Sequence, residues 1–152
     1  MTGYPASFLL VLDTNVIVSS QKGSSNSPNR EILTRWKNRE FDILFSRDVI
    51  YEYYKKLKQF DISPEIIEEL IYRIRKTACE VEVEFFHLEK YPTDPDDIAF
   101  LLCADNGQAT HLVTYDTCLL ELDGFYKFKI CQPLPFLHEL RKNVRKASPH
   151  TG

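Results

Sequence analysis

The sequence lacks a long apolar run and lacks any sign of an export signal. None of the hydrophobic stretches in this 152-residue chain approaches the roughly 20 residues that a membrane-spanning helix requires. The first residues also lack a basic segment followed by an apolar stretch, which is the pattern of a secretory signal peptide. We therefore expect no membrane association and a cytoplasmic location.

Paired cysteine motifs are also absent. Cys79, Cys103, Cys118 and Cys131 show no C-x-x-C spacing, and each lies in an apolar or otherwise regular segment. This pattern predicts reduced, buried thiols. A zinc site or a disulfide framework is the less favoured alternative, because a chain of this length can build a hydrophobic core without such cross-links.

The composition is that of an ordinary globular domain. With 43% hydrophobic and 27% charged residues, the chain resembles neither a disordered nor a fibrous protein. No internal repeat is visible, and the length suits one domain, which we expect to span residues 1–145 before a disordered tail at 146–152. The net charge of −3 does not exclude a nucleic-acid partner, because an acidic catalytic cluster can coexist with a basic patch.

Short apolar segments alternate with helical patterns along the chain. Strands are expected at residues 8–12, 41–45, 80–85, 111–114 and 126–131. Helices are expected at residues 29–37, from Ser46, from Ser63, at 94–105, at 117–122 and from Pro133. This alternation predicts an α/β fold, a three-layer sandwich in which helices flank a central, mainly parallel sheet.

Two segments of this pattern carry more specific expectations. Residues 19–29 are rich in Ser, Gly, Lys and Asn, so a mobile loop is predicted there. Residues 80–85 alternate glutamate with valine or phenylalanine, which predicts an exposed edge strand with Phe85 on the same face as the valines.

Four acidic residues stand where such a fold places a ligand site. Asp13 follows the first strand directly, and Asp116 comes two residues after the fourth. The carboxyl ends of parallel strands meet at one edge of the sheet, where ligands bind. Asp97 lies in the first turn of an apolar helix, and Glu52 lies beside the apolar stripe of another. We therefore expect all four carboxylates to reach one cleft.

Such a cluster needs a cation. Two carboxylates about 4 Å apart repel by roughly 4 kcal/mol at an effective dielectric constant near 20. Oxygen ligands without a matching His or Cys pattern favour Mg²⁺ or Mn²⁺ over zinc, and such an ion suits phosphodiester hydrolysis. Each acid also has a simpler interpretation, because an aspartate after a strand is often a turn former or helix cap and a helical glutamate is usually solvated.

Taken together, four segments resemble the PIN-domain ribonucleases, particularly the toxin halves of prokaryotic toxin–antitoxin pairs. LVLDTNVIVSS is similar to the opening strand of the family, with its D-x-N signature, and SRDVIYEYYKKL resembles the helix that bears the second acid. DPDDIAFLLCADNGQATHLVTYD resembles the most telling stretch of the family, and ICQPLPFLHEL resembles its last strand and helix. The resemblance covers nearly the whole chain.

The resemblance implies specific roles and partners. Asp13, Glu52, Asp97 and Asp116 would be both catalytic and metal-binding, with Asn15 and Thr114 in supporting positions. The activity implied is an Mg²⁺- or Mn²⁺-dependent endoribonuclease that hydrolyses RNA. The implied partners are the RNA substrate, a cognate antitoxin and a second copy of the chain in a homodimer.

Other interpretations remain open at this point. A haloacid dehalogenase phosphatase would need a second aspartate at the position of Asn15, and a receiver domain would need a lysine after a late strand. The more serious alternative is a non-catalytic PIN-like module that binds RNA or protein. Two basic runs could contact RNA, although such runs are more often solvated faces: Lys55, Lys56 and Lys58, and Arg141, Lys142, Arg145 and Lys146.

Overall fold

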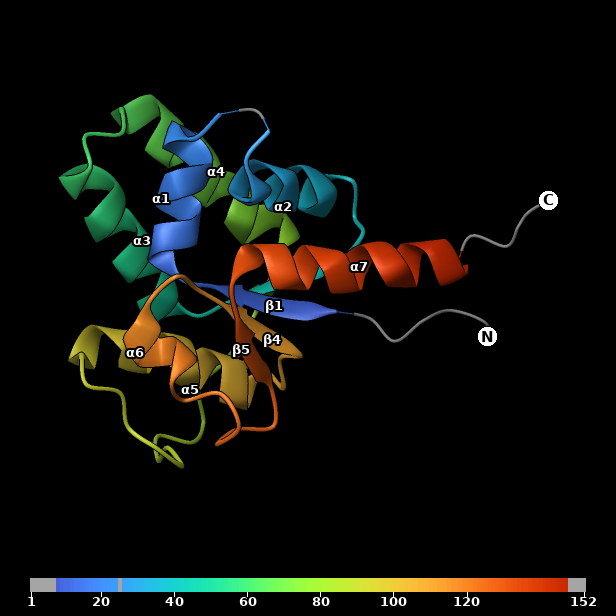
Figure 1. Ribbon diagram of the computed structural model, residues 1–152. Helices are drawn as coiled ribbons and strands as arrows, with labels where there is room; N and C mark the ends of the chain where they lie inside the picture. Colours follow the sequence, from blue (N-terminus) through green and yellow to red (C-terminus); the bar gives the residue numbers. More distant parts are fainter. Residues whose placement is uncertain (1–7, 25, 148–152) are drawn as a thin grey trace.

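A parallel five-stranded sheet lies at the centre of the protein in a computed structural model (Figure 1). The structure describes residues 8–24 and 26–147, and side chains as far as residue 143. The strands are β1 (Leu9–Leu12), β2 (Asp42–Phe45), β3 (Cys79–Glu80), β4 (His111–Val113) and β5 (Lys129–Cys131). Their order is β3-β2-β1-β4-β5, and every neighbouring pair is parallel.

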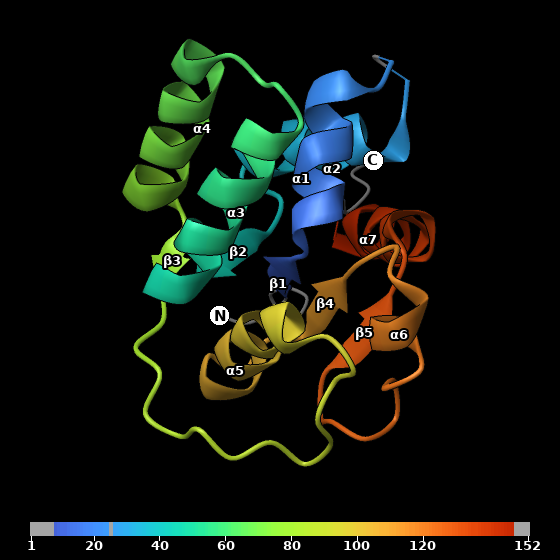
Figure 2. The same cartoon turned by 90° about the vertical axis from the view of Figure 1, so that its left-hand side faces the viewer.

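Helices cover both faces of this sheet. They are α1 (Thr14–Lys22), α2 (Pro28–Lys37), α3 (Arg47–Gln59), α4 (Pro64–Thr77), α5 (Ile98–Asn106), α6 (Thr117–Leu120), α7 (Pro133–Ala147) and a 3₁₀ turn, η1 (Pro95–Asp97). Figure 2 shows α5 on one side of the sheet and α1, α2 and α7 on the other. The predicted three-layer α/β sandwich is therefore confirmed. Among the described residues, no helix is both long and apolar enough to cross a membrane.

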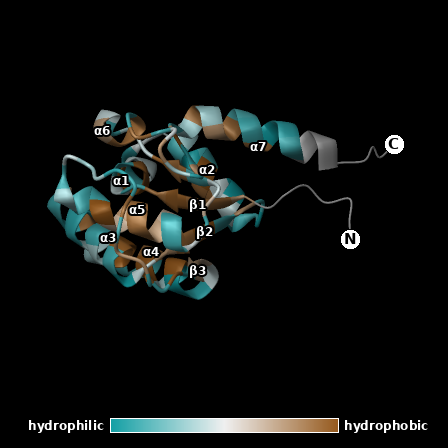
Figure 3. Ribbon diagram, turned by 90° about the horizontal axis from the view of Figure 1, so that it is seen from below, coloured by the Kyte–Doolittle hydropathy of each residue, from teal (hydrophilic) through white to brown (hydrophobic). Residues whose placement is uncertain are grey.

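The most buried parts of the fold are β1 and the helix packed beneath it. Leu10, Val11 and Leu12 are fully buried, because β2 and β4 flank β1 and helices cover both of its faces. Helix α5 is apolar around most of its circumference and contacts β1, β2 and β4 (Figure 3). The hydroxyl of Tyr53 on α3 donates a 2.5 Å hydrogen bond to the Leu12 carbonyl, which ties α3 to the end of β1.

The order of the strands creates a crevice beside the end of β1. The chain passes from β1 to β2 on one side, and β4 later pairs with β1 on the other side. At such a switch point the connections after the two central strands run to opposite faces, which leaves an opening at their carboxyl ends. Asp13 follows β1, and Asp116 follows β4 by three residues.

The predicted edge strand at 80–85 is wrong beyond its first residue. Only Cys79 and Glu80 pair with β2, and the chain then leaves the sheet. The Asn106 side chain accepts hydrogen bonds from the backbone N–H groups of Glu84 and Phe85 and donates one to the Phe85 carbonyl. These contacts replace a strand neighbour. Phe85 is 66% exposed rather than packed with the valines.

The predicted loop at 19–29 is shorter than expected. Helix α1 continues to Lys22, and α2 begins at Pro28. The helix persists because Val16, Ile17 and Val18 pack into the core. The Ser20 hydroxyl is buried and donates to the Ile17 carbonyl, so this serine belongs to the packed face of α1.

The cysteines follow the prediction only in part. All four are free thiols, but Cys79 and Cys118 are exposed, Cys131 is half-buried and only Cys103 is buried. The exposed pair lies at an edge strand and on the short helix α6, where little of the chain covers them. At the C-terminus, α7 extends to Ala147, and residues 148–152 of the predicted tail lie outside the described residues.

Candidate functional site

Hydrogen bonds from its backbone and to both of its carboxylate oxygens hold Asp13 at the end of β1. Its backbone N–H donates to the Val113 carbonyl at 2.9 Å. One carboxylate oxygen accepts from the Thr14 N–H at 2.7 Å, and the other accepts from the Thr114 hydroxyl at 2.6 Å. Burial raises the pKa of Asp13, and the hydrogen bonds from Thr114 and Thr14 offset only part of that rise.

Thr114 connects two of the aspartates. It is fully buried at the end of β4. Its hydroxyl donates to Asp13 and accepts from the backbone N–H of Asp116 at 2.9 Å. Because one hydroxyl serves both residues, Thr114 sets the position of Asp116 relative to Asp13.

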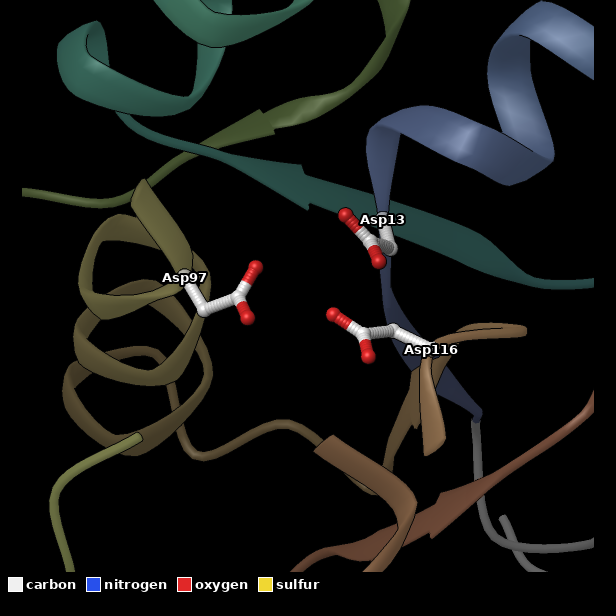
Figure 4. Close-up of side chains that lie close together, drawn as sticks. All are labelled: Asp13, Asp97 and Asp116. Atoms are coloured by element: carbon white, nitrogen blue, oxygen red, sulfur yellow. The ribbon is translucent and has the colours of Figure 1, made fainter. Parts of the chain in front are cut away.

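Asp116 caps the short helix α6. One of its carboxylate oxygens accepts from the Cys118 N–H at 2.9 Å. The side chain is half-buried and faces Asp13 and Asp97 across the crevice (Figure 4). The helix-cap interpretation is thus correct for Asp116, and capping leaves its second oxygen available to a ligand.

Asp97 approaches the cluster from the opposite side. It ends η1, directly before α5, in a turn that begins where the Asp94 side chain accepts from the Asp96 N–H at 2.9 Å. The side chain is 7% exposed, and one of its oxygens is buried without a hydrogen-bond partner among the described residues. Burial, followed by the negative charges of Asp13 and Asp116, raises the pKa of Asp97 to about 8.

The three aspartates form one group of possible ligands. One oxygen from each lies within 4.8 Å of the others. Oxygens bound to one Mg²⁺ at about 2.1 Å lie about 3.0 Å apart when adjacent and about 4.2 Å apart when opposite, so the three carboxylates would move closer together to bind a single ion. The oxygen-only ligands, the strong mutual repulsion and the unpartnered Asp97 oxygen all fit a divalent cation.

Glu52 lines the same cavity but stands apart from this group. The cavity has a volume of about 300 Å³, and its walls include Asp13, Glu52, Asp97 and Asp116. Glu52 is largely buried on α3 and pairs with Lys55, with 3.2 Å between Nζ and Oε2. The structure therefore brings all four predicted acids to one cavity and three of them close together. Their catalytic roles stay predictions.

Asn15 also lines this cavity. Its side-chain oxygen accepts from the Tyr115 N–H at 3.4 Å, a long hydrogen bond between the start of α1 and the segment after β4. The contact links the two segments that carry Asp13 and Asp116.

Among the described side chains of the two basic runs, only those of one run are shown to lie near the acids. Lys56 lines the cavity. In the other run, Arg141 binds Glu31 of α2 at 2.6 Å and so fastens α7 to α2. The side chains of Arg145 and Lys146 lie outside the described residues.

Several further residues around the site were not predicted from the sequence. Asp94 and Asp96 line the cavity beside Asp97, and their place next to the predicted ligand was the available signal. Ser19 lines the cavity one helical turn after Asn15, a spacing that became meaningful only once α1 was known to be a helix. Tyr53 looked like an ordinary core residue, and no sequence signal marked its hydrogen bond to Leu12.

Comparison with known proteins agrees with this arrangement. Residues 9–118 match the family described as the PIN domain, a segment that holds all four acids and most of the sheet. PIN domains are generally nucleases and typically use divalent metal ions. No curated protein matches the chain. Because the match spans well over half of the sequence, the chain belongs to the PIN-domain family.

Proposed function

We propose that the protein is an endoribonuclease that depends on Mg²⁺ or Mn²⁺. The single observation that carries the proposal is the buried Asp97 oxygen, which has no hydrogen-bond partner among the described residues and faces two further carboxylates (Figure 4). A buried group of like charges is unstable alone, and a divalent cation supplies the missing opposite charge. Asp13, Asp97 and Asp116 would be its ligands, with Glu52 joining directly or through water.

Different residues of the site would bind the metal, position its ligands and contact the substrate. A divalent ion bound there would lower the pKa of a bound water and offset the negative charge of the phosphate. Thr114 holds Asp13 and Asp116 in position through its two hydrogen bonds. Asn15 bridges to the segment before Asp116. The Lys56 ammonium, in the wall of the cavity, would contact a phosphate oxygen of the RNA.

We further propose the biological setting that the sequence resemblance implies. The protein would be the toxin of a toxin–antitoxin pair, act on RNA in the cytoplasm, form a homodimer and bind a cognate antitoxin. This part rests on the similarity of residues 10–20 and 94–116 to such toxins. The alternative is a non-catalytic PIN-like module that binds RNA or protein. The presence of all four acids in one cavity favours catalysis.

Cleavage of RNA by matched variants tests the activity. Asp97→Asn keeps the size of the side chain but removes a charge that would bind the cation. Asp105→Asn makes the same change on α5 at a residue that does not line the cavity. The parent and Asp105→Asn proteins should cleave a mixed pool of single-stranded RNA with Mn²⁺, and EDTA should stop both. Asp97→Asn should lose at least about 100-fold in rate, because even changes behind metal ligands often cost 10–100-fold.

Two results would contradict the proposal. Cleavage of equal rate by Asp97→Asn, purified in parallel and folded by circular dichroism, would mean that a contaminating nuclease is responsible. If the parent protein shows no EDTA-sensitive cleavage and both proteins bind the RNA equally well, the non-catalytic binding module would be the better account.

A further inference from the structure

The cavity has apolar as well as acidic walls. Besides the carboxylates, its walls include Val18 of α1, Phe100 of α5 and Phe60 at the end of α3. Val18 and Phe100 are buried parts of the core, whereas the Phe60 side chain is 47% exposed. About half of the Phe60 side chain is therefore left uncovered by the rest of the fold.

Val18 and Phe60 come from two neighbouring segments of the wall, α1 and the end of α3. Helices α1 and α3 are in contact and run side by side away from the carboxyl edge of the sheet (Figure 2). Phe60 directly follows α3 and is eight residues beyond Glu52, which corresponds to about 12 Å along a helix axis. We take this interval as the space for a sugar and a phosphate between Glu52 and the ring.

One lysine lines the cavity, and a second lies over the Phe60 ring. Lys56 lines the cavity. The Nζ atom of Lys22, at the end of α1, lies 5.4 Å from the centre of the Phe60 ring. Asp94 and Asp96 also line the cavity. A polyanion entering the cavity would therefore be repelled by these carboxylates and attracted to the lysines near the aromatic ring.

An exposed ring with cations beside it, continuous with a candidate phosphodiester-cleaving centre, matches the chemistry of one nucleotide. Bases stack on aromatic side chains, and lysines contact the phosphates on either side. A base inside a duplex cannot stack on the ring without leaving its partner. A cavity of about 300 Å³ is at the small end of ligand pockets, which suits a nucleotide rather than a helix of RNA.

We propose that Phe60 is the stacking platform for the base next to the scissile phosphate, and that Lys22 and Lys56 bind the phosphates flanking it. This inference rests on the proposed ribonuclease function and specifies its substrate as RNA with an unpaired base at the cleavage site. Phe60 acts as a specificity residue that contacts the substrate, and it takes no part in the chemical step.

A binding experiment tests this without relying on cleavage. Every protein carries Asp97→Asn, which reduces repulsion in the cavity, and EDTA is present. The probes are fluorescein-labelled RNA of eight adenosines and an abasic strand with the same backbone. The protein that carries Asp97→Asn alone, which is the parent in this experiment, should bind the adenosine strand more tightly than the abasic strand. Phe60→Ala should weaken binding of the adenosine strand by about 5- to 160-fold, the range expected for losing one stacked base, and should leave the abasic strand unaffected.

Matched variants separate stacking from other effects. Phe60→Trp should retain the preference for bases. Tyr72→Ala should also retain it, because Tyr72 is an exposed ring beside Lys76 (5.7 Å) on α4 but does not line this cavity. Lys22→Ala should weaken binding of both probes equally. It should also reduce the slope of the logarithm of the affinity against the logarithm of the salt concentration by about one.

The proposal is overturned if the parent binds both probes equally, or if Phe60→Ala and Tyr72→Ala have equal effects. In the otherwise unmutated protein, Phe60→Ala should raise KM for single-stranded RNA and leave the Mn²⁺ requirement unchanged. Metal-dependent cleavage with an unchanged KM would overturn the stacking role and leave the ribonuclease function intact. Base-dependent binding without any cleavage would overturn the ribonuclease function and leave the stacking role of Phe60 intact.

Discussion

At the scale of single residues, the Asp97 carboxyl group makes the stability of the fold depend on pH. It is buried opposite Asp13 and Asp116, and its pKa is raised to about 8, chiefly by burial and then by those two charges. In the absence of metal, the folded protein therefore holds a proton at Asp97 at pH values where the unfolded chain has released it.

This gives a first prediction about pH. Between the ordinary pKa of 3.8 and about 8, the folded state binds more protons than the unfolded state, so raising the pH destabilises the fold. Asp97→Asn removes this dependence. In EDTA, the melting temperature of the variant minus that of the parent should become more positive from pH 5 to pH 8. A difference that stays constant across this range would contradict the prediction, and Asp105→Asn is the matched control.

At the scale of elements, Asn106 at the end of α5 organises the chain that leaves β3. Its side chain makes three hydrogen bonds to the backbone of Glu84 and Phe85 and a fourth, at 2.8 Å, to the Leu102 carbonyl of its own helix. The segment after β3 makes no further strand pairing within the described sheet, so Asn106 is its main polar attachment to α5.

We therefore predict that Asn106→Ala loosens this segment. Net contributions of about 0.5–1.5 kcal/mol per hydrogen bond, reduced by partial exposure, suggest a loss of about 1–2 kcal/mol in the free energy of unfolding. Urea unfolding measures the loss, and faster hydrogen exchange at Glu84 and Phe85 locates it. Asn106→Asp keeps the two accepting contacts and should lose less. Unchanged exchange in Asn106→Ala would show that other contacts hold the segment.

The elements that the sequence predicted well are those with local signals. The caps Ser46 and Ser63 accept hydrogen bonds from the N–H groups of Val49 and Ile66, as their positions before apolar helical patterns indicated. The segment at 80–85 has an equally clear pattern, but a strand needs a neighbour. Its neighbour is instead the side chain of Asn106, which lies more than 20 residues away.

At the scale of the whole molecule, the sequence predicted the layers of the fold and the convergence of the acids on one cavity. The parallel sheet follows from the alternation of strands and helices, and parallel strands place the residues after β1 and β4 at one edge. The separation of Glu52 from the three aspartates could not be predicted. It depends on the packing of α3 against α1 and on the pairing of Glu52 with Lys55.

Titration calorimetry with MnCl₂ measures whether Asp13, Asp97 and Asp116 bind a divalent cation. The parent and Asp105→Asn proteins should bind Mn²⁺ with equal affinity and should melt at a higher temperature in its presence, because only the folded state holds the three carboxylates together. Asp97→Asn should show little or no binding and no such rise. Equal binding by Asp97→Asn, or no binding by the parent protein, would contradict the account.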